Sequence, residues 1–230
     1  PANGLIYSTP TPCSCYQTAL LKGFNALSDE IPPEPEPFEL IKGPSFGTEL
    51  EPPSDASDSD WPTFRRNTGR EGSATTSLGP NIRQSWTQDL GGRLTQPIVA
   101  DGRLYVCSRE KRTLYALNAS TGDILWTFST PAEIDSSPTY FQGMLLFGCR
   151  NGWVYNLSAA DGEQIWSFRA APTERRIVSY GSVESSWPVI GSLLVLEEED
   201  RTVVYAAAGR NSYLDGGIYL YGLDVVTGEI

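Results

Sequence analysis

The sequence predicts an all-β fold, a partial β-propeller built from four-stranded antiparallel blades, and three observations carry this prediction. Trp86, Trp126 and Trp166 follow one another at intervals of 40 residues. Gly122 and Gly162 recur at the same distance from these tryptophans, in short polar turns between apolar segments. The apolar segments are of strand length and alternate with turn residues. Units of about 40–45 residues with four short strands are typical of propeller blades. The alternative is a β-sandwich in which the tryptophan spacing is a coincidence.

Each unit is expected to contain four strands in the same order. The first strand follows a proline, as Ile98-Val99-Ala100 follows Pro97, and the second is a run such as RLYVC (103–107), MLLFGC (144–149) or SLLVL (192–196). The third is TLYAL, WVYNL or IYLYGL, and the fourth carries the tryptophan. Between the third and fourth strands lies a tight turn whose glycine needs a positive φ. One blade is too small to bury both of its faces, so neighbouring blades must stack.

These turns carry a resemblance to a known family. The run Ala116-x-Asn118-x-x-Thr121-Gly122-x-x-x-Trp126 resembles the tryptophan-docking motif of the quinoprotein (PQQ-like) propellers. The next copy keeps only the glycine and the tryptophan, and the third copy is incomplete; their residues at the motif positions are Asn156, Ser158, Asp161, Gly162 and Trp166, and then Gly222, Asp224, Thr227 and Gly228. The segment DWPTFRRNTGREG (60–72) is similar to the lead-in of such propellers. The resemblance covers roughly residues 60–230 and implies that the tryptophan rings lie between blades.

The chain divides into three predicted parts. Residues 1–28 look like the second half of a preceding blade, with a CxC loop between strands at 3–8 and 21–28. Residues 29–59 form an acidic, Pro-rich linker or insertion that we expect to be extended or disordered. Residues 60–230 hold a lead-in segment (60–90) and blades at about 93–130, 134–170 and 183–230, the last one truncated. A propeller closes with about 4–8 blades, so the remaining blades are expected elsewhere in the full-length chain.

Composition excludes several classes of function. The net charge is −11, but residues 29–60 hold ten acids against Lys42, so the rest of the chain is nearly neutral and has no basic surface for nucleic acid. No apolar run approaches the roughly 18 residues of a membrane span. The chain has no histidine, which removes Ser-His-Asp and Cys-His catalysis and histidine metal sites. Any chemistry must use carboxylates, arginine, tyrosine or thiols.

A candidate ligand site is expected on one rim of the propeller. In this fold the loops from the fourth strand to the next first strand (D–A) and from the second to the third strand (B–C) share a rim, and these loops are polar here. Arginine outnumbers lysine 14 to 3, and its fork suits carboxylates, phosphates and other anionic or sugar-like ligands. The alternative is a solvated loop face without a specific ligand. The most site-like residues are Arg176, Glu184, Trp187, Arg210, Asn211 and Asp215.

The resemblance implies two readings of the function. The first is a non-catalytic binding or assembly scaffold of an exported bacterial protein, in the periplasm or at the cell surface, with an envelope protein or a small ligand as partner. The second is a fragment of a quinoprotein oxidoreductase that uses PQQ and calcium. Glu184, Asp215 and Trp187 are of the residue types that such an enzyme needs, but they do not match the family's active-site sequences, so no catalytic residue is assigned.

The cysteines raise a third hypothesis, a redox or metal role for the CxC loop. Cys13 and Cys15 are separated by one residue, which fits metal ligands, a redox pair or disulfide partners. A zinc site would need two more ligands, and Cys107 and Cys149 fall on second strands of different blades. We therefore expect Cys13 and Cys15 to form disulfides with cysteines elsewhere in an exported chain, no metal site, and buried free thiols at Cys107 and Cys149.

Overall fold

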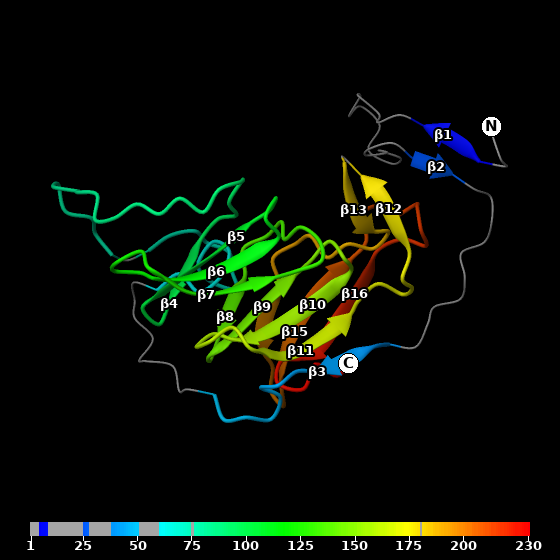
Figure 1. Ribbon diagram of the computed structural model, residues 1–230. Coiled ribbons are helices and arrows are strands. Elements are labelled where there is room, and N and C mark those ends of the chain that lie inside the picture. Colours follow the sequence, from blue (N-terminus) through cyan, green and yellow to red (C-terminus); the bar gives the residue numbers. More distant parts are fainter. Residues whose placement is uncertain (1–4, 9–24, 28–37, 51–59, 75, 180) are drawn as a thin grey trace.

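A computed structural model describes residues 5–8, 25–27, 38–50, 60–74, 76–179 and 181–230. All of the regular elements in this part are β-strands (Figure 1). Among the described residues no helix is long and apolar enough to cross a bilayer. The predicted all-β, open propeller architecture is confirmed, because no described sheet closes on itself and consecutive sheets stack against one another.

Two four-stranded antiparallel blades occupy the middle of the chain. The first contains β4 (Ile98–Ala100), β5 (Arg103–Ser108), β6 (Thr113–Asn118) and β7 (Ile124–Ser129), paired in that order. The second contains β8 (Thr139–Phe141), β9 (Met144–Gly148), β10 (Trp153–Ser158) and β11 (Gln164–Arg169). The last strand of each blade carries the tryptophan, opposite Ala116 in the first blade and Asn156 in the second.

The third sheet corrects one strand assignment. It contains β14 (Leu194–Glu197), β15 (Thr202–Ala208) and β16 (Tyr219–Asp224). The run 192–196, expected as a second strand, supplies the first strand instead, and the unpredicted β15 is the middle one. The acidic residues 198–200 therefore lie in the turn between the first two strands of this sheet, directly after Glu197 at the end of β14. Both apolar runs have strand length, so the sequence pattern alone could not order them.

Each tryptophan of the repeat packs on the turn of the next sheet. The indole N–H groups of Trp86, Trp126 and Trp166 donate to the carbonyls of Ala119 (3.0 Å), Ala159 (3.2 Å) and Val225 (3.1 Å). The rings cover Gly122, Gly162 and Gly228, all of which have positive φ. A Cβ on Gly162 would lie 2.5 Å from Cε3 of Trp126, so no other residue allows this approach.

Two clusters of buried side chains join the sheets. Ile98, Leu114 and Phe147 belong to the cluster between the first two blades, together with Cys107 and Cys149. The other cluster joins the second blade to the third sheet and includes Trp166, Phe168 and Leu223. Both clusters contain residues from facing strands of two sheets, so the blades stabilise each other through apolar burial.

Two segments that precede the blades in the sequence form backbone hydrogen bonds with strands of the blades. β3 (Leu40–Lys42), from the predicted acidic linker, pairs antiparallel with β11 and makes the second sheet five-stranded (Figure 1). Trp61 exchanges backbone hydrogen bonds with Val99, and Pro62 accepts one from the amide of Tyr140. The lead-in segment thus contacts the first strands of both blades. β1 (Ile6–Ser8) and β2 (Asn25–Leu27) pair antiparallel, while their place in a preceding blade stays a prediction.

Two glycine substitutions distinguish the stability cost of a clash with the tryptophan ring from the cost of a side chain at positive φ. We expect Gly162→Ala to lower the free energy of unfolding by about 2–4 kcal/mol, because the methyl group both meets the Trp126 ring and sits at positive φ. Gly102→Ala is the matched control, since Gly102 has φ +68 and no heavy atom within 4 Å of an added Cβ. It should cost about 1 kcal/mol. Urea unfolding of both variants measures the difference, and equal losses would contradict the proposed role of the ring.

Candidate functional site

The polar loops of three sheets meet along one rim. Backbone hydrogen bonds connect each B–C loop to a D–A loop: the Arg109 amide donates to the Arg93 carbonyl, and the Arg150 amide donates to the Glu133 carbonyl, both at 3.0 Å. The long connection after β11 continues this pattern, because the amide of Ser185 donates to the Arg150 carbonyl at 2.8 Å. That connection contains a hairpin of β12 (Arg176–Ser179) and β13 (Ser182–Ser185), which projects beside the sheets (Figure 1).

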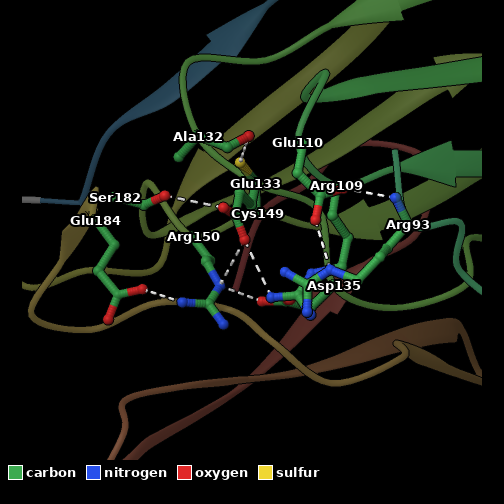
Figure 2. Close-up of polar contacts among 10 residues, drawn as sticks. All are labelled: Arg93, Arg109, Glu110, Ala132, Glu133, Asp135, Cys149, Arg150, Ser182 and Glu184. Carbon is green, nitrogen blue, oxygen red and sulfur yellow. Dashed lines mark hydrogen bonds and ion pairs between the residues drawn. The ribbon is translucent and has the colours of Figure 1, made fainter. Parts of the chain in front are cut away.

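The first charged group on the rim is an alternating chain of arginines and carboxylates (Figure 2). Arg109 contacts Asp135 at 2.5 Å and Glu133 at 3.0 Å. Arg150 forms ion pairs with Asp135 and with Glu184, whose side chain is only 5% exposed. The hydroxyl of Ser182 donates to Glu133 at 2.9 Å. We call these five charged residues and Ser182 the Arg150 cluster; it joins loops of both blades to the projecting hairpin.

The neighbouring carboxylates favour the charged form of Arg150. Burial alone would lower the pKa of Arg150, but its hydrogen bonds and charge interactions with Asp135 and Glu184 outweigh burial and raise the pKa above its ordinary value. Arg150 lies between Asp135 and Glu184, while Arg109 lies between Glu133 and Asp135, so two arginines hold three carboxylates. The cluster is therefore an ion-pair network.

The second charged group is centred on Asp215, in the loop between β15 and β16. Its carboxylate contacts Arg175 at 2.9 Å and Arg210 at 2.7 Å. Its backbone carbonyl accepts the indole N–H of Trp187 at 2.7 Å, and the guanidinium of Arg175 lies 6.0 Å from the centre of the Trp187 ring. We call these four residues the Asp215 cluster. The buried Nε atoms of Arg210 here and of Arg109 in the first cluster have no partner within the described structure.

The structure distributes the predicted site residues over both clusters. Trp187, Arg210 and Asp215 lie together, whereas Glu184 belongs to the Arg150 cluster. Arg176 is mostly exposed and lies 3.5 Å from Glu174, and the side chain of Asn211 accepts the amide of Tyr213 within its own loop. Glu184 and Arg176 make their ion pairs with Arg150 and Glu174, so a common site with Arg210 stays a prediction.

Sequence reasoning missed Glu133 and Asp135. Both lie in the loop PAEID, which follows the fourth strand of the first blade. A search for acids at D–A loop positions opposite B–C arginines could have found them, since that is the relation they have to Arg109 and Arg150.

The carboxylates on this rim do not fit the calcium site that a quinoprotein enzyme requires. Glu184 and Asp215 each accept hydrogen bonds from arginine, and calcium needs several oxygen ligands around one point. Within the described ranges no group of three or more His, Cys, Asp or Glu side chains is placed to hold a metal ion. The donor atoms described for this rim serve ion pairing.

Two buried thiols lie directly beneath the rim. Cys107 and Cys149 are free and buried, as predicted. The thiol of Cys149 donates to the carbonyl of Ala132 at 3.4 Å (Figure 2). Burial raises the pKa of both thiols, so neither carries thiolate at neutral pH. Cys13 and Cys15 lie outside the described residues, and their disulfides stay a prediction.

Comparison with known proteins places the repeat in a family. Residues 64–229 match the family model described as outer membrane protein assembly factor BamB. The chain is 28% identical over 111 residues to the BamB of Burkholderia pseudomallei, covering 47% of this chain and 29% of that protein. It is 27% identical over 111 residues to the dehydrogenase subunit of a quinone alcohol dehydrogenase from Gluconacetobacter polyoxogenes, covering 42% of this chain and 15% of that protein.

The fold is also similar to that of a solved enzyme. The quinohemoprotein alcohol dehydrogenase of Comamonas testosteroni superposes with a TM-score of 0.59 at 19% identity, covering 76% of this chain and 27% of that one. This similarity shows the propeller fold. In each of these comparisons the chain spans less than a third of the other protein's length.

Removing the central guanidinium should destabilise the rim. We expect Arg150→Met to lower the free energy of unfolding by about 2–4 kcal/mol, because Glu184 loses the arginine that it pairs with and Asp135 keeps only Arg109, in a largely buried place. Arg176→Met is the matched control, since the side chain of Arg176 is 66% exposed, and should change stability by less than about 0.5 kcal/mol. Denaturant unfolding compares them; a loss of similar size in both variants would show that the network contributes nothing.

The two buried thiols should resist modification in the folded protein. In a background with Cys13→Ser and Cys15→Ser, we expect a disulfide-forming aromatic reagent at about pH 8 to label Cys107 and Cys149 only when urea unfolds the chain. The reason is their burial and raised pKa. Ser129→Cys, at an exposed strand position, is the control that should react at once. Rapid native labelling of Cys107 or Cys149 would contradict the buried arrangement.

Proposed function

The chain belongs to the outer membrane protein assembly factor BamB family of PQQ-like repeat propellers, and from this membership we propose that it is a non-catalytic binding or assembly module. The binding surface is the rim that carries the Arg150 and Asp215 clusters. The proposed location is the periplasm or the cell surface of a bacterium, in accord with the envelope role named for the BamB relatives.

The observation that carries this proposal is the pairing of the rim carboxylates. Asp135, Glu184 and Asp215 each face at least one arginine. A catalytic base needs a lone pair that is free to accept a proton at working pH. Carboxylates held by guanidinium groups are poor bases and serve instead to fix loops in one geometry, which is what a recognition surface needs.

The chemistry of the rim indicates what it binds. Arg175 is 43% exposed and Arg176 66% exposed, and the projecting hairpin presents Val178 and Val183, which pair across its strands and are 58% and 51% exposed. Exposed guanidinium groups beside an apolar pair suit a partner protein of the envelope with acidic and apolar side chains. The exposed guanidinium groups of Arg175 and Arg176 would also suit the acceptor oxygens of a small anionic or sugar-like ligand.

The alternative is a fragment of a quinoprotein oxidoreductase that binds PQQ and calcium. The observation that favours it is the sequence match to dehydrogenase subunits. The donor arrangement described for Glu184 and Asp215 weighs against it, because both carboxylates are engaged by arginines.

Two measurements on the full-length protein decide between these functions. We expect a photo-reactive side chain at position 176, on the exposed hairpin, to cross-link one envelope protein in growing cells. The same group at position 201, in the β14–β15 turn and also exposed, is the control and should give no adduct. Addition of PQQ with calcium should give neither bound-quinone absorbance nor dye-linked alcohol oxidation; their appearance would replace the scaffold with the oxidoreductase.

A further inference from the structure

The outer edge of the first blade is a strand without charged residues that no other described strand covers. β7 is the terminal strand of its sheet in the described part of the chain and reads ILWTFS. Ile124 and Leu125 are 44% and 48% exposed, and Thr127 and Ser129 are also exposed. Edge strands of natural proteins are usually protected by charges, prolines or a covering segment. β7 has neither a charge nor a proline.

The equivalent edge of the second blade is covered. Sequence repetition places Gln164–Arg169 (β11) at the positions of Ile124–Ser129, and both strands have a register irregularity next to their first residue. On β11 the amide of Arg169 donates to the Glu39 carbonyl at 2.9 Å, and the carbonyl of Ile165 accepts the Gly43 amide at 2.8 Å. Ile165 is 4% exposed, whereas Leu125 at the same repeat position is 48% exposed. The added strand β3 accompanies this difference.

The strand β3 also covers the contact between Trp166 and Gly228. A side-chain carbon of Leu40 lies 2.8 Å from the position of a Cβ on Gly228, beside the ring of Trp166. Trp166 is fully buried, while Trp126 at the equivalent junction stays partly exposed. Within the described residues the two edges thus have the same register irregularity and the same apolar junction, but only the edge of β11 is covered.

We propose that β7 is a docking site for an extended segment of a partner polypeptide, which adds to it as an antiparallel fifth strand in the way that β3 adds to β11. The register follows from the repeat: the incoming residues oppose Trp126, Thr127 and Phe128, as Lys42, Ile41 and Leu40 oppose Trp166, Ser167 and Phe168. Backbone groups of Leu125, Thr127 and Ser129 point to the incoming strand, because they correspond to Ile165, Ser167 and Arg169. This site is separate from the rim and does not depend on the rim function.

The geometry of β3 defines what the docked segment must contain. It needs an apolar residue opposite Phe128, where β3 has Leu40. It needs glycine one position after the residue opposite Trp126, because a Cβ on Gly43 would lie 2.1 Å from the carbonyl oxygen of Gln164. It needs no acid at the position of Glu39, since Arg169, which pairs with Glu39 at 3.2 Å, is replaced by Ser129 on β7.

A designed peptide tests the proposal on the full-length protein. The peptide FSLIKGPSF is residues 38–46 with Glu39→Ser, and residue-resolved hydrogen exchange reads the result. At about 1 mM peptide we expect exchange of the Thr127 and Ser129 amides to slow about tenfold or more, because these amides gain acceptors, as the Arg169 amide does on β11. The amides of Trp126 and Phe128 already face β6 and should not change.

Two controls keep the peptide test specific. The same peptide with Gly43→Val, or with methylated backbone nitrogens, should give no slowing. Thr127→Pro in the protein should abolish the effect while leaving the urea midpoint close to that of the parent, since proline is tolerated at edge positions whose N–H faces outward. If Thr127→Pro proves unstable, the methylated peptide carries the comparison alone.

Several outcomes would overturn the proposal. Unchanged exchange in β7 at about 1 mM peptide, or equal slowing with the methylated peptide, removes the docking site. Slowing confined to residues 40–42 means that the peptide takes the free edge of β3 instead. Slowing that depends on protein concentration without peptide, together with a dimer in sedimentation, makes a second copy of the chain the occupant.

Discussion

The packing of each tryptophan on the glycine of the following turn fixes the arrangement of the blades. The contact combines three requirements: a ring that fills the gap, an indole N–H with a carbonyl acceptor, and a turn residue without a side chain. Gly122, Gly162 and Gly228 meet the last requirement with positive φ and close ring contacts. Since the same turn also connects the third and fourth strands, one contact sets both the stacking distance and the strand register of a blade.

That arrangement brings loops from different blades to a common rim, where charge joins them. Arg109 comes from the first blade, Arg150 from the second and Glu184 from the hairpin beyond it, while Glu133 and Asp135 lie in the loop between the blades. No pair in this network is close in sequence, so its geometry exists only when the blades are stacked. The tryptophan contacts buried between the blades therefore determine the position of the charged groups on the surface.

The sequence could predict the strands that recur with the 40-residue repeat. It could predict few of the contacts between residues that are far apart in the chain. Strands β4–β11 and the buried Cys107 and Cys149 follow from period and register. The strand β3 could not be predicted, because its partner β11 lies more than 120 residues later and its own composition is typical of a linker. Glu184 could be chosen as a candidate by residue type, but its partner Arg150 could not, since a B–C loop arginine has several acids within reach.

The two complete blades differ more at their edges than in their interiors. Both have the same strand order and the same register irregularity just before the tryptophan of the last strand. Their outer strands nevertheless diverge in chemistry, with Arg169 and Gln164 on β11 where β7 has Ser129 and Ile124. Arg169 is 5% exposed and needs a counter-charge, which Glu39 of the added strand supplies. Because the repeat fixes the backbone of an outer strand and leaves its outward side chains free to vary, edge chemistry decides which segment each blade accepts.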